Sequence, residues 1–171
     1  MTNPCGHSKK NEIMITNTYL IKALDCYPFN LEESLESLNY AMAYEANNPI
    51  ALCLMGRVQL EIFKDYALAD SYFREAIAAN NNYLETYTYF LECLLIREEF
   101  EEMTKLLAFA RKRKGIDRGI MLYYEAMLFE KQLKFKKAQK TIKQAMLLAQ
   151  TNSFMSDLEE MKKRIEKKSQ L

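Results

Sequence analysis

One apolar pattern recurs four times along this 171-residue chain at nearly constant intervals. In each copy, a residue that is usually small is followed by an apolar residue four positions later and by alanine three positions after that. The copies are Ser34, Leu38 and Ala41; Ala69, Phe73 and Ala76; Met103, Leu107 and Ala110; and Ala138, Ile142 and Ala145. They begin 35, 34 and 35 residues apart. This period indicates a structural repeat, and spacings of four and three place each set on one face of a helix.

A second amphipathic segment and a short polar break precede each copy. The chain is therefore predicted to form antiparallel helix pairs over 12–27 and 30–46, 49–63 and 66–79, 82–97 and 99–114, and 117–131 and 134–150. Asn30 with Glu33 has the spacing of a capping box, and Asn48 before Pro49 is typical of a helix start. Asp117 can cap the helix that follows it.

Two further helix ends are predicted from local signals. Asn82 with Glu85 repeats the capping-box spacing at the start of the 82–97 helix. The basic residues 111–114 would occupy the last turn of the 99–114 helix, with Gly115 directly after it.

The last segment, 152–168, is apolar along one narrow edge only. This edge consists of Phe154, Leu158, Met161 and Ile165, and the remaining residues are mostly charged. A helix of this kind covers the open end of a repeat stack and presents its polar side to water. We therefore expect a C-terminal capping helix.

The composition also favours an all-helical chain. There are only 4 glycines and 3 prolines, and β-hairpins and tight loops need both, so a β-sandwich or barrel is disfavoured. The predicted fold class is all-α, an α-solenoid of about four antiparallel helix pairs plus a C-terminal capping helix. We expect a disordered N-terminal tail over 1–11 and one repeat domain over 12–168. Its repeats would cover about 12–48, 49–81, 82–116 and 117–151, followed by the capping helix 152–168.

The sequence resembles the tetratricopeptide repeat (TPR) family, which repeats two helices about every 34 residues. The second repeat matches best and carries Tyr66, Ala69, Phe73 and Ala76. Gly56 lies within one residue of the family's small position in the first helix. The family's tryptophan is absent, and Pro49 alone represents its inter-repeat proline. The resemblance implies a right-handed superhelix whose first helices line the inner face.

The residue inventory argues against catalysis. The only histidine, His7, lies in the predicted tail, which excludes Ser–His and Cys–His chemistry in the core. The four glycines never have the spacing of a phosphate-binding loop. The four cysteines are far apart, and Cys5 with His7 does not make a closed metal site. We expect no enzyme activity, no cofactor and no metal site.

Charge divides the chain into two parts of opposite sign. Residues 1–110 carry eight Lys/Arg and sixteen Asp/Glu, a net charge of −8, whereas residues 111–171 carry sixteen and seven, a net charge of +9. Two interpretations stay open: solvated faces that differ in sign, or ends that steer partners or other copies of the chain.

The basic part suggests a surface for polyanions. Its predicted patch consists of Arg111, Lys112, Arg113, Lys114, Lys136, Lys140 and Lys143. Such a patch can hold phosphates without sequence preference. Nucleic acid is nevertheless the less favoured partner, because lysine predominates on the last repeat and no aromatic platform for stacking bases accompanies it.

Protein binding is the favoured function. By the register of the family, the candidate residues on the inner face are Arg57, Glu61, Thr88, Glu92, Tyr123, Tyr124 and Met127. Aromatic and charged side chains there would anchor a peptide or helix of a partner, although each could instead pack between helices. We predict a non-catalytic adaptor or scaffold, with a client chaperone and an RNA- or polyanion-binding repeat as alternatives. A place in a larger complex and self-association are further expectations.

No apolar run reaches the length of a signal peptide or of a membrane-spanning helix. We therefore expect a cytoplasmic protein without membrane insertion.

Overall fold

The computed structural model describes residues 18–170, and within them it contains helices and turns but no β-strand. This confirms the all-α prediction. The predicted tail over 1–11 and residues 12–17 of the first predicted helix lie outside the described residues. The described residues form two compact units, 18–83 and 84–170.

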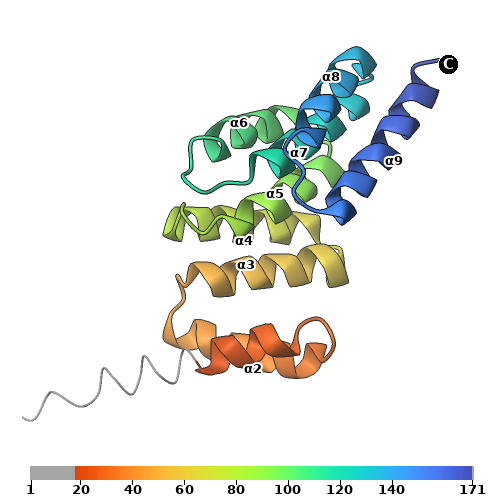
Figure 1. The fold of residues 1–171 in the computed structure, drawn as a ribbon. Coiled ribbons are helices and arrows are strands. Elements are labelled where there is room, and N and C mark those ends of the chain that lie inside the picture. Colours follow the sequence, from red (N-terminus) through yellow and green to blue (C-terminus); the bar gives the residue numbers. More distant parts are fainter. Residues whose placement is uncertain (1–17, 171) are drawn as a thin grey trace, which may run out of the picture. The chain divides into compact units, whose positions relative to one another are not determined.

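Two helix pairs form the N-terminal unit (Figure 1). A helix over 18–26 pairs with α2 (Leu31–Tyr44), and α3 (Pro49–Arg57) continues as the π-helix η1 (Val58–Phe63) before α4 (Tyr66–Ala79). The predicted caps are confirmed. The side chain of Asn30 accepts a hydrogen bond from the backbone N–H of Glu33, and that of Asn48 accepts from the N–H groups of Ile50 and Ala51.

Two further pairs and the final helix form the C-terminal unit. The pairs are α5 (Glu85–Ile96) with α6 (Phe100–Ala110) and α7 (Arg118–Lys131) with α8 (Phe135–Met146), and α9 (Asn152–Lys168) follows. Asp117 caps α7 as predicted, because its Oδ1 accepts from the N–H of Ile120 at 3.0 Å. Leu158, Met161 and Ile165 of α9 are buried in one core cluster with residues of α7 and α8.

Three predicted helix ends are wrong. Helix α8 ends at Met146, four residues before the predicted end at 150. Helix α5 begins at Glu85, and the backbone N–H of Asn82 instead donates to Oδ1 of Asn80 at 2.9 Å, in the turn before the helix. Helix α6 ends at Ala110, so residues 111–114 form a turn rather than a last helical turn. The reason is that the amides of Lys112 and Arg113 bond to carbonyls only three residues back, which ends the α-helical ladder.

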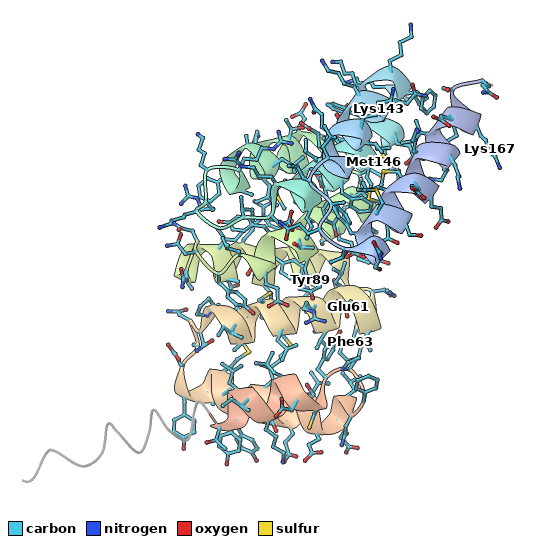
Figure 2. All side chains as sticks on the ribbon, viewed as in Figure 1. Glu61, Phe63, Tyr89, Lys143, Met146 and Lys167 are labelled. Atoms are coloured by element: carbon cyan, nitrogen blue, oxygen red, sulfur yellow. The ribbon has the colours of Figure 1, made fainter. Side chains whose placement is uncertain are left out.

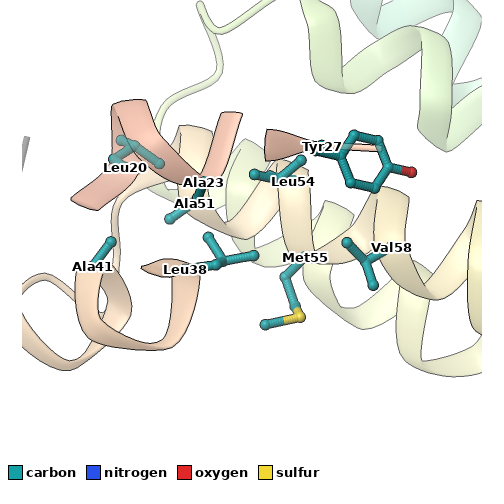
Figure 3. Packing of buried hydrophobic residues seen from close by; sticks show 9 residues of the cluster. All are labelled: Leu20, Ala23, Tyr27, Leu38, Ala41, Ala51, Leu54, Met55 and Val58. Carbon is teal, nitrogen blue, oxygen red and sulfur yellow. The ribbon is translucent and has the colours of Figure 1, made fainter. Parts of the chain in front are cut away.

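The repeated small and apolar residues form the cores of both units. All twelve members of the four sets are buried. Serine replaces alanine at position 34 without an orphaned hydroxyl, because Ser34 Oγ donates to the carbonyl of Ala23 at 2.7 Å. In the N-terminal unit, nine buried residues pack together; they come from the helix over 18–26, the turn after it, α2, α3 and η1 (Figure 3).

Close approach within the second pair depends on Gly56. A Cβ atom at this position would lie 2.6 Å from Cε1 of Phe73, so α3 and α4 meet where the first has no side chain. Phe73 itself is fully buried.

Three of the turns between paired helices share one geometry. Lys64, Glu98 and Leu133 have φ values of 58°, 59° and 58°, in the left-handed region that ends many helices. Two of these residues are charged, whereas Leu133 is apolar and 73% exposed.

Candidate functional site

Four of the five predicted inner-face residues of the C-terminal unit lie near one another and near Arg164 of α9; they are Glu92, Tyr123, Tyr124 and Met127. We call this region the α5–α7–α9 face and define it by Tyr89, Glu92, Tyr123, Tyr124, Met127 and Arg164. The Tyr123 ring lies nearly perpendicular to that of Tyr124, with centroids 5.5 Å apart, and its centroid is 5.9 Å from that of Phe154. Tyr89 is labelled on α5 in Figure 2. Thr88, also on α5, is half-buried.

The two central phenols remain neutral over the physiological range. Burial raises the pKa of Tyr124 far above its usual value, and the nearby carboxylate of Glu92 adds to this effect. Burial also raises the pKa of Tyr123, with Asp157 as the next cause. Both hydroxyls therefore stay able to donate a hydrogen bond. Tyr124 is buried, so the half-buried ring of Tyr123 is the one that offers contact area.

A cavity of about 440 Å³ opens at one end of this face. Its lining is Leu95, Met127, Glu130, Lys131, Leu133, Arg164 and Lys168. Met127 is the one member that the sequence analysis had named. The volume is in the range of sites that hold small ligands or a few side chains.

Glu130 organises the charged side of the cavity. Its buried carboxylate accepts hydrogen bonds from Nε and Nη2 of Arg164 at 2.9 and 2.8 Å and from Nζ of Lys168 at 2.8 Å. The Arg164 hydrogen bond lowers the pKa of Glu130, against the opposing effect of burial. The carboxylate is therefore ionised, and it connects α9 to α7.

In the N-terminal unit, Arg57 and Glu61 belong to an internal cluster. Nε of Arg57 lies 3.2 Å from Oε1 of Glu61, and the hydroxyl of Tyr27 donates to Oε2 of Glu61 at 2.5 Å. The Arg57 guanidinium also lies 4.9 Å from the centre of the Tyr27 ring. Both predicted residues thus contribute to the packing of the first pair on the second, and a role in partner binding stays a prediction.

Each of these two clusters contains a pair of residues separated by one repeat period, a spacing that was not used in the sequence-based predictions. Tyr27 and Glu61 are 34 residues apart, and so are Glu130 and Arg164. Residues one repeat period apart occupy the same turn of neighbouring first helices, so they face each other. The repeat period was therefore the signal that could have predicted the Glu130–Arg164 pair, once α9 is counted as the first helix of an unfinished repeat.

Two arginines of the predicted basic patch interact with other side chains of the chain, whereas its lysines are exposed. Arg111 forms an ion pair with Glu125 at 2.8 Å, and the guanidinium of Arg113 lies 4.5 Å from the centre of the Phe109 ring. Lys112 and Lys114 are exposed in the turn after α6. On α8, which contains no acidic residue, Lys136, Lys140 and Lys143 are exposed. Lys143 is labelled in Figure 2.

Among residues 18–170, no group of three or more His, Cys, Asp or Glu side chains is arranged to hold a metal ion. Within the same range, no helix has the length and apolar character needed to cross a bilayer.

Several solved structures share this fold. PilF of Pseudomonas aeruginosa superposes with a TM-score of 0.73 and 18% sequence identity, over 86% of this chain and 69% of that one. A thermophilic TPR protein of Thermus thermophilus gives 0.69 and 19%, over 85% and 80%. MamA of Desulfovibrio magneticus RS-1 gives 0.66 and 17%, over 90% of each chain. No protein-family model and no curated protein sequence matches the chain. The structural likeness shows that the chain has a TPR-like helical-repeat fold.

Proposed function

We propose that this chain is a non-catalytic protein-interaction module that binds a segment of a partner protein on the α5–α7–α9 face. The observation that carries this proposal is the meeting of Tyr123, Tyr124 and Met127 beside an open cavity. Aromatic side chains and methionine are enriched where proteins bind one another. Aromatic rings provide a large contact area for few ordered torsions, and the flexible methionine side chain adapts to the shape of the partner. The TPR-like fold is consistent with this role.

Affinity isolation from cells of the source organism tests the proposal. The bait would be the full chain, compared with the double variant Tyr123→Ala/Met127→Ala and with Lys140→Ala/Lys143→Ala on α8 as the matched control. Circular dichroism would first establish that each variant retains its helical content. We expect the specific partner to be lost by the first variant and retained by the second. Equal recovery of every partner by the wild type and the first variant would contradict the proposal.

A polyanion surface on α8 is the second candidate function. It is supported by exposed Lys136, Lys140 and Lys143, which have no ion pair among the described residues and no acidic neighbour on their own helix. Such a surface binds phosphates in a strongly salt-dependent manner. If Lys140→Ala/Lys143→Ala loses binding to an RNA mixture that the wild type retains at low salt, this candidate is supported. Undetectable binding at low salt would exclude it.

The client-chaperone alternative predicts a different result for the same face. A client held there would become insoluble when expressed alone and soluble when co-expressed with this chain. Loss of that solubility with Tyr123→Ala/Met127→Ala would assign the effect to the α5–α7–α9 face.

A further inference from the structure

The cavity at the end of the α5–α7–α9 face has one apolar side and one cationic side. Leu95, Met127 and Leu133 supply the apolar side, and Lys131, Arg164 and Lys168 supply the cationic side. We propose that this cavity selects acidic partner segments in which an aspartate or glutamate lies beside a large apolar residue. This proposal rests on the proposed function and specifies the partner for the same face.

The cationic side has an excess of positive charge. Among the described residues, Glu130 is the only acidic one that lines the cavity, and its carboxylate pairs with both Arg164 and Lys168. Lys131 adds a third cation, which also lies 3.3 Å from Glu98 in an exposed pair that contributes little. One carboxylate between two cations leaves the lining itself net positive, and Glu160 is a further acidic group that acts on Arg164 from outside the lining. A second carboxylate bound in the cavity can neutralise this excess.

The donors that such a carboxylate needs are available. Arg164 donates hydrogen bonds to Glu130 from Nε and from one N–H of Nη2, and Lys168 donates one N–H of its ammonium group to the same carboxylate. Within the described part of the chain, the other N–H groups of these two side chains have no protein acceptor. The two side chains are 44% and 49% exposed, so a ligand can reach them. Because Glu130 holds the guanidinium in place, little conformational entropy is lost when a ligand binds.

Leu133 supports the apolar half of the proposal. It is 73% exposed, and its φ of 58° is a conformation that a leucine adopts only at a cost. The equivalent turns carry lysine and glutamate at the same φ, so this turn geometry does not itself require an apolar side chain. An exposed leucine at the rim of the cavity is accounted for if an apolar residue of the partner packs on it.

The area next to this rim is also cationic. A second, smaller cavity shares Leu133 and is lined further by Lys134, Phe135, Lys136, Lys137 and Ser169. None of its lining residues within 18–170 is acidic. Additional acidic residues of a bound segment would therefore continue to meet positive charge as the segment leaves the first cavity.

Selection from a random peptide library displayed on phage, with the full chain as target, tests this inference. Selected peptides would be synthesised with blocked termini, and their Kd values measured by fluorescence anisotropy. We expect them to carry aspartate or glutamate beside leucine, isoleucine, phenylalanine or methionine, and to bind more weakly as salt is added.

Matched variants locate the binding. Leu133→Ser and Lys168→Gln should each weaken binding about tenfold, as expected for loss of an apolar contact or a charge-assisted hydrogen bond. Leu147→Ser, at an 85% exposed leucine after α8, and Lys163→Gln, at an exposed lysine of α9, should leave the Kd unchanged. Lys168→Gln retains the Arg164 pair with Glu130, so the anchoring of α9 is preserved.

The outcomes separate the two proposals. Peptides that are sensitive to Tyr123→Ala/Met127→Ala, but lack acidic residues or bind equally to Leu133→Ser and Lys168→Gln, would overturn this inference and leave the proposed function standing. If no selected peptide is sensitive to either group of variants, both proposals fail.

Discussion

Replacing Gly56 by alanine tests the close packing of α3 on α4. The new Cβ would lie 2.6, 2.8 and 3.1 Å from Cε1, Cδ1 and Cζ of Phe73, which is fully buried. Forcing an extra methyl group into such a core costs about 1–3 kcal/mol. Alanine in a helix interior gains about 0.8–1.0 kcal/mol over glycine. Two of the contacts with Phe73 are shorter than 3.0 Å, so the packing cost lies in the upper part of its range, about 2–3 kcal/mol. The net effect is a loss of about 1–2 kcal/mol in the free energy of unfolding.

Thermal unfolding followed by circular dichroism at 222 nm measures this change. For a chain of this size the loss corresponds to a decrease in Tm of about 2–6 °C. An unchanged or increased Tm would refute the packing argument. It would mean that the gain from the higher helix propensity of alanine is not outweighed by any steric cost of the new methyl group.

A double-mutant cycle with Phe73→Leu identifies the contact responsible. Leucine lacks Cε1 and Cζ, the atoms that lie 2.6 and 3.1 Å from the new Cβ. Phe73→Leu alone should destabilise by about 1–2 kcal/mol, because it removes buried volume. In that background Gly56→Ala should cost about 1 kcal/mol less than in the wild type, a coupling typical of residues in contact. Additive effects to within about 0.3 kcal/mol would mean that Phe73 is not the obstacle.

Three further predictions concern the C-terminal unit. The Arg164 hydrogen bond lowers the folded-state pKa of Glu130, so the pair stabilises the fold above the unfolded pKa of about 4.3 and this contribution is lost as pH falls through the lower folded value. The Tm difference between the wild type and Glu130→Gln should therefore be largest near pH 7 and decrease in acid, and a pH-independent difference would contradict this. Asp117→Ala removes the cap of α7 and should destabilise by about 1 kcal/mol in denaturant titrations, with Asp117→Asn nearly neutral. Leu133→Gly should stabilise by up to about 1 kcal/mol, because glycine adopts positive φ without steric cost, whereas Leu133→Ala should give no such gain.

The repeat pattern accounts for most of the fold that could be predicted. The four sets of small and apolar residues are all buried, and Asn30, Asn48 and Asp117 cap the helices they were expected to cap. These features depend on side chains within one helix or one turn of it. Local spacing therefore suffices to predict them.

The predictions that failed concern helix ends with competing local signals. Asn82 and the basic residues 111–114 have favourable spacing for a start and an end. The backbone instead adopts turns there, with bonds from Asn82 to Asn80 and from Arg113 to Ala110. At these sites several hydrogen-bonding arrangements are close in free energy, so the spacing alone did not choose between them.

The sequence by itself determined which residues face inward, because that depends on the periods of the helix and of the repeat. The repeat period places Glu130 opposite Arg164, but only the tertiary structure decided which of the polar side chains within reach form hydrogen bonds. The carboxylate of Glu130 accepts hydrogen bonds from both Arg164 and Lys168. Glu61 has a similar position two pairs earlier, but its carboxylate accepts hydrogen bonds from Arg57 and Tyr27. A long charged side chain has several rotamers and several neighbours within reach, and the packing of adjacent helices selects one of them. The cationic cavity beside Leu133 results from that selection, and no single segment of the chain encodes it.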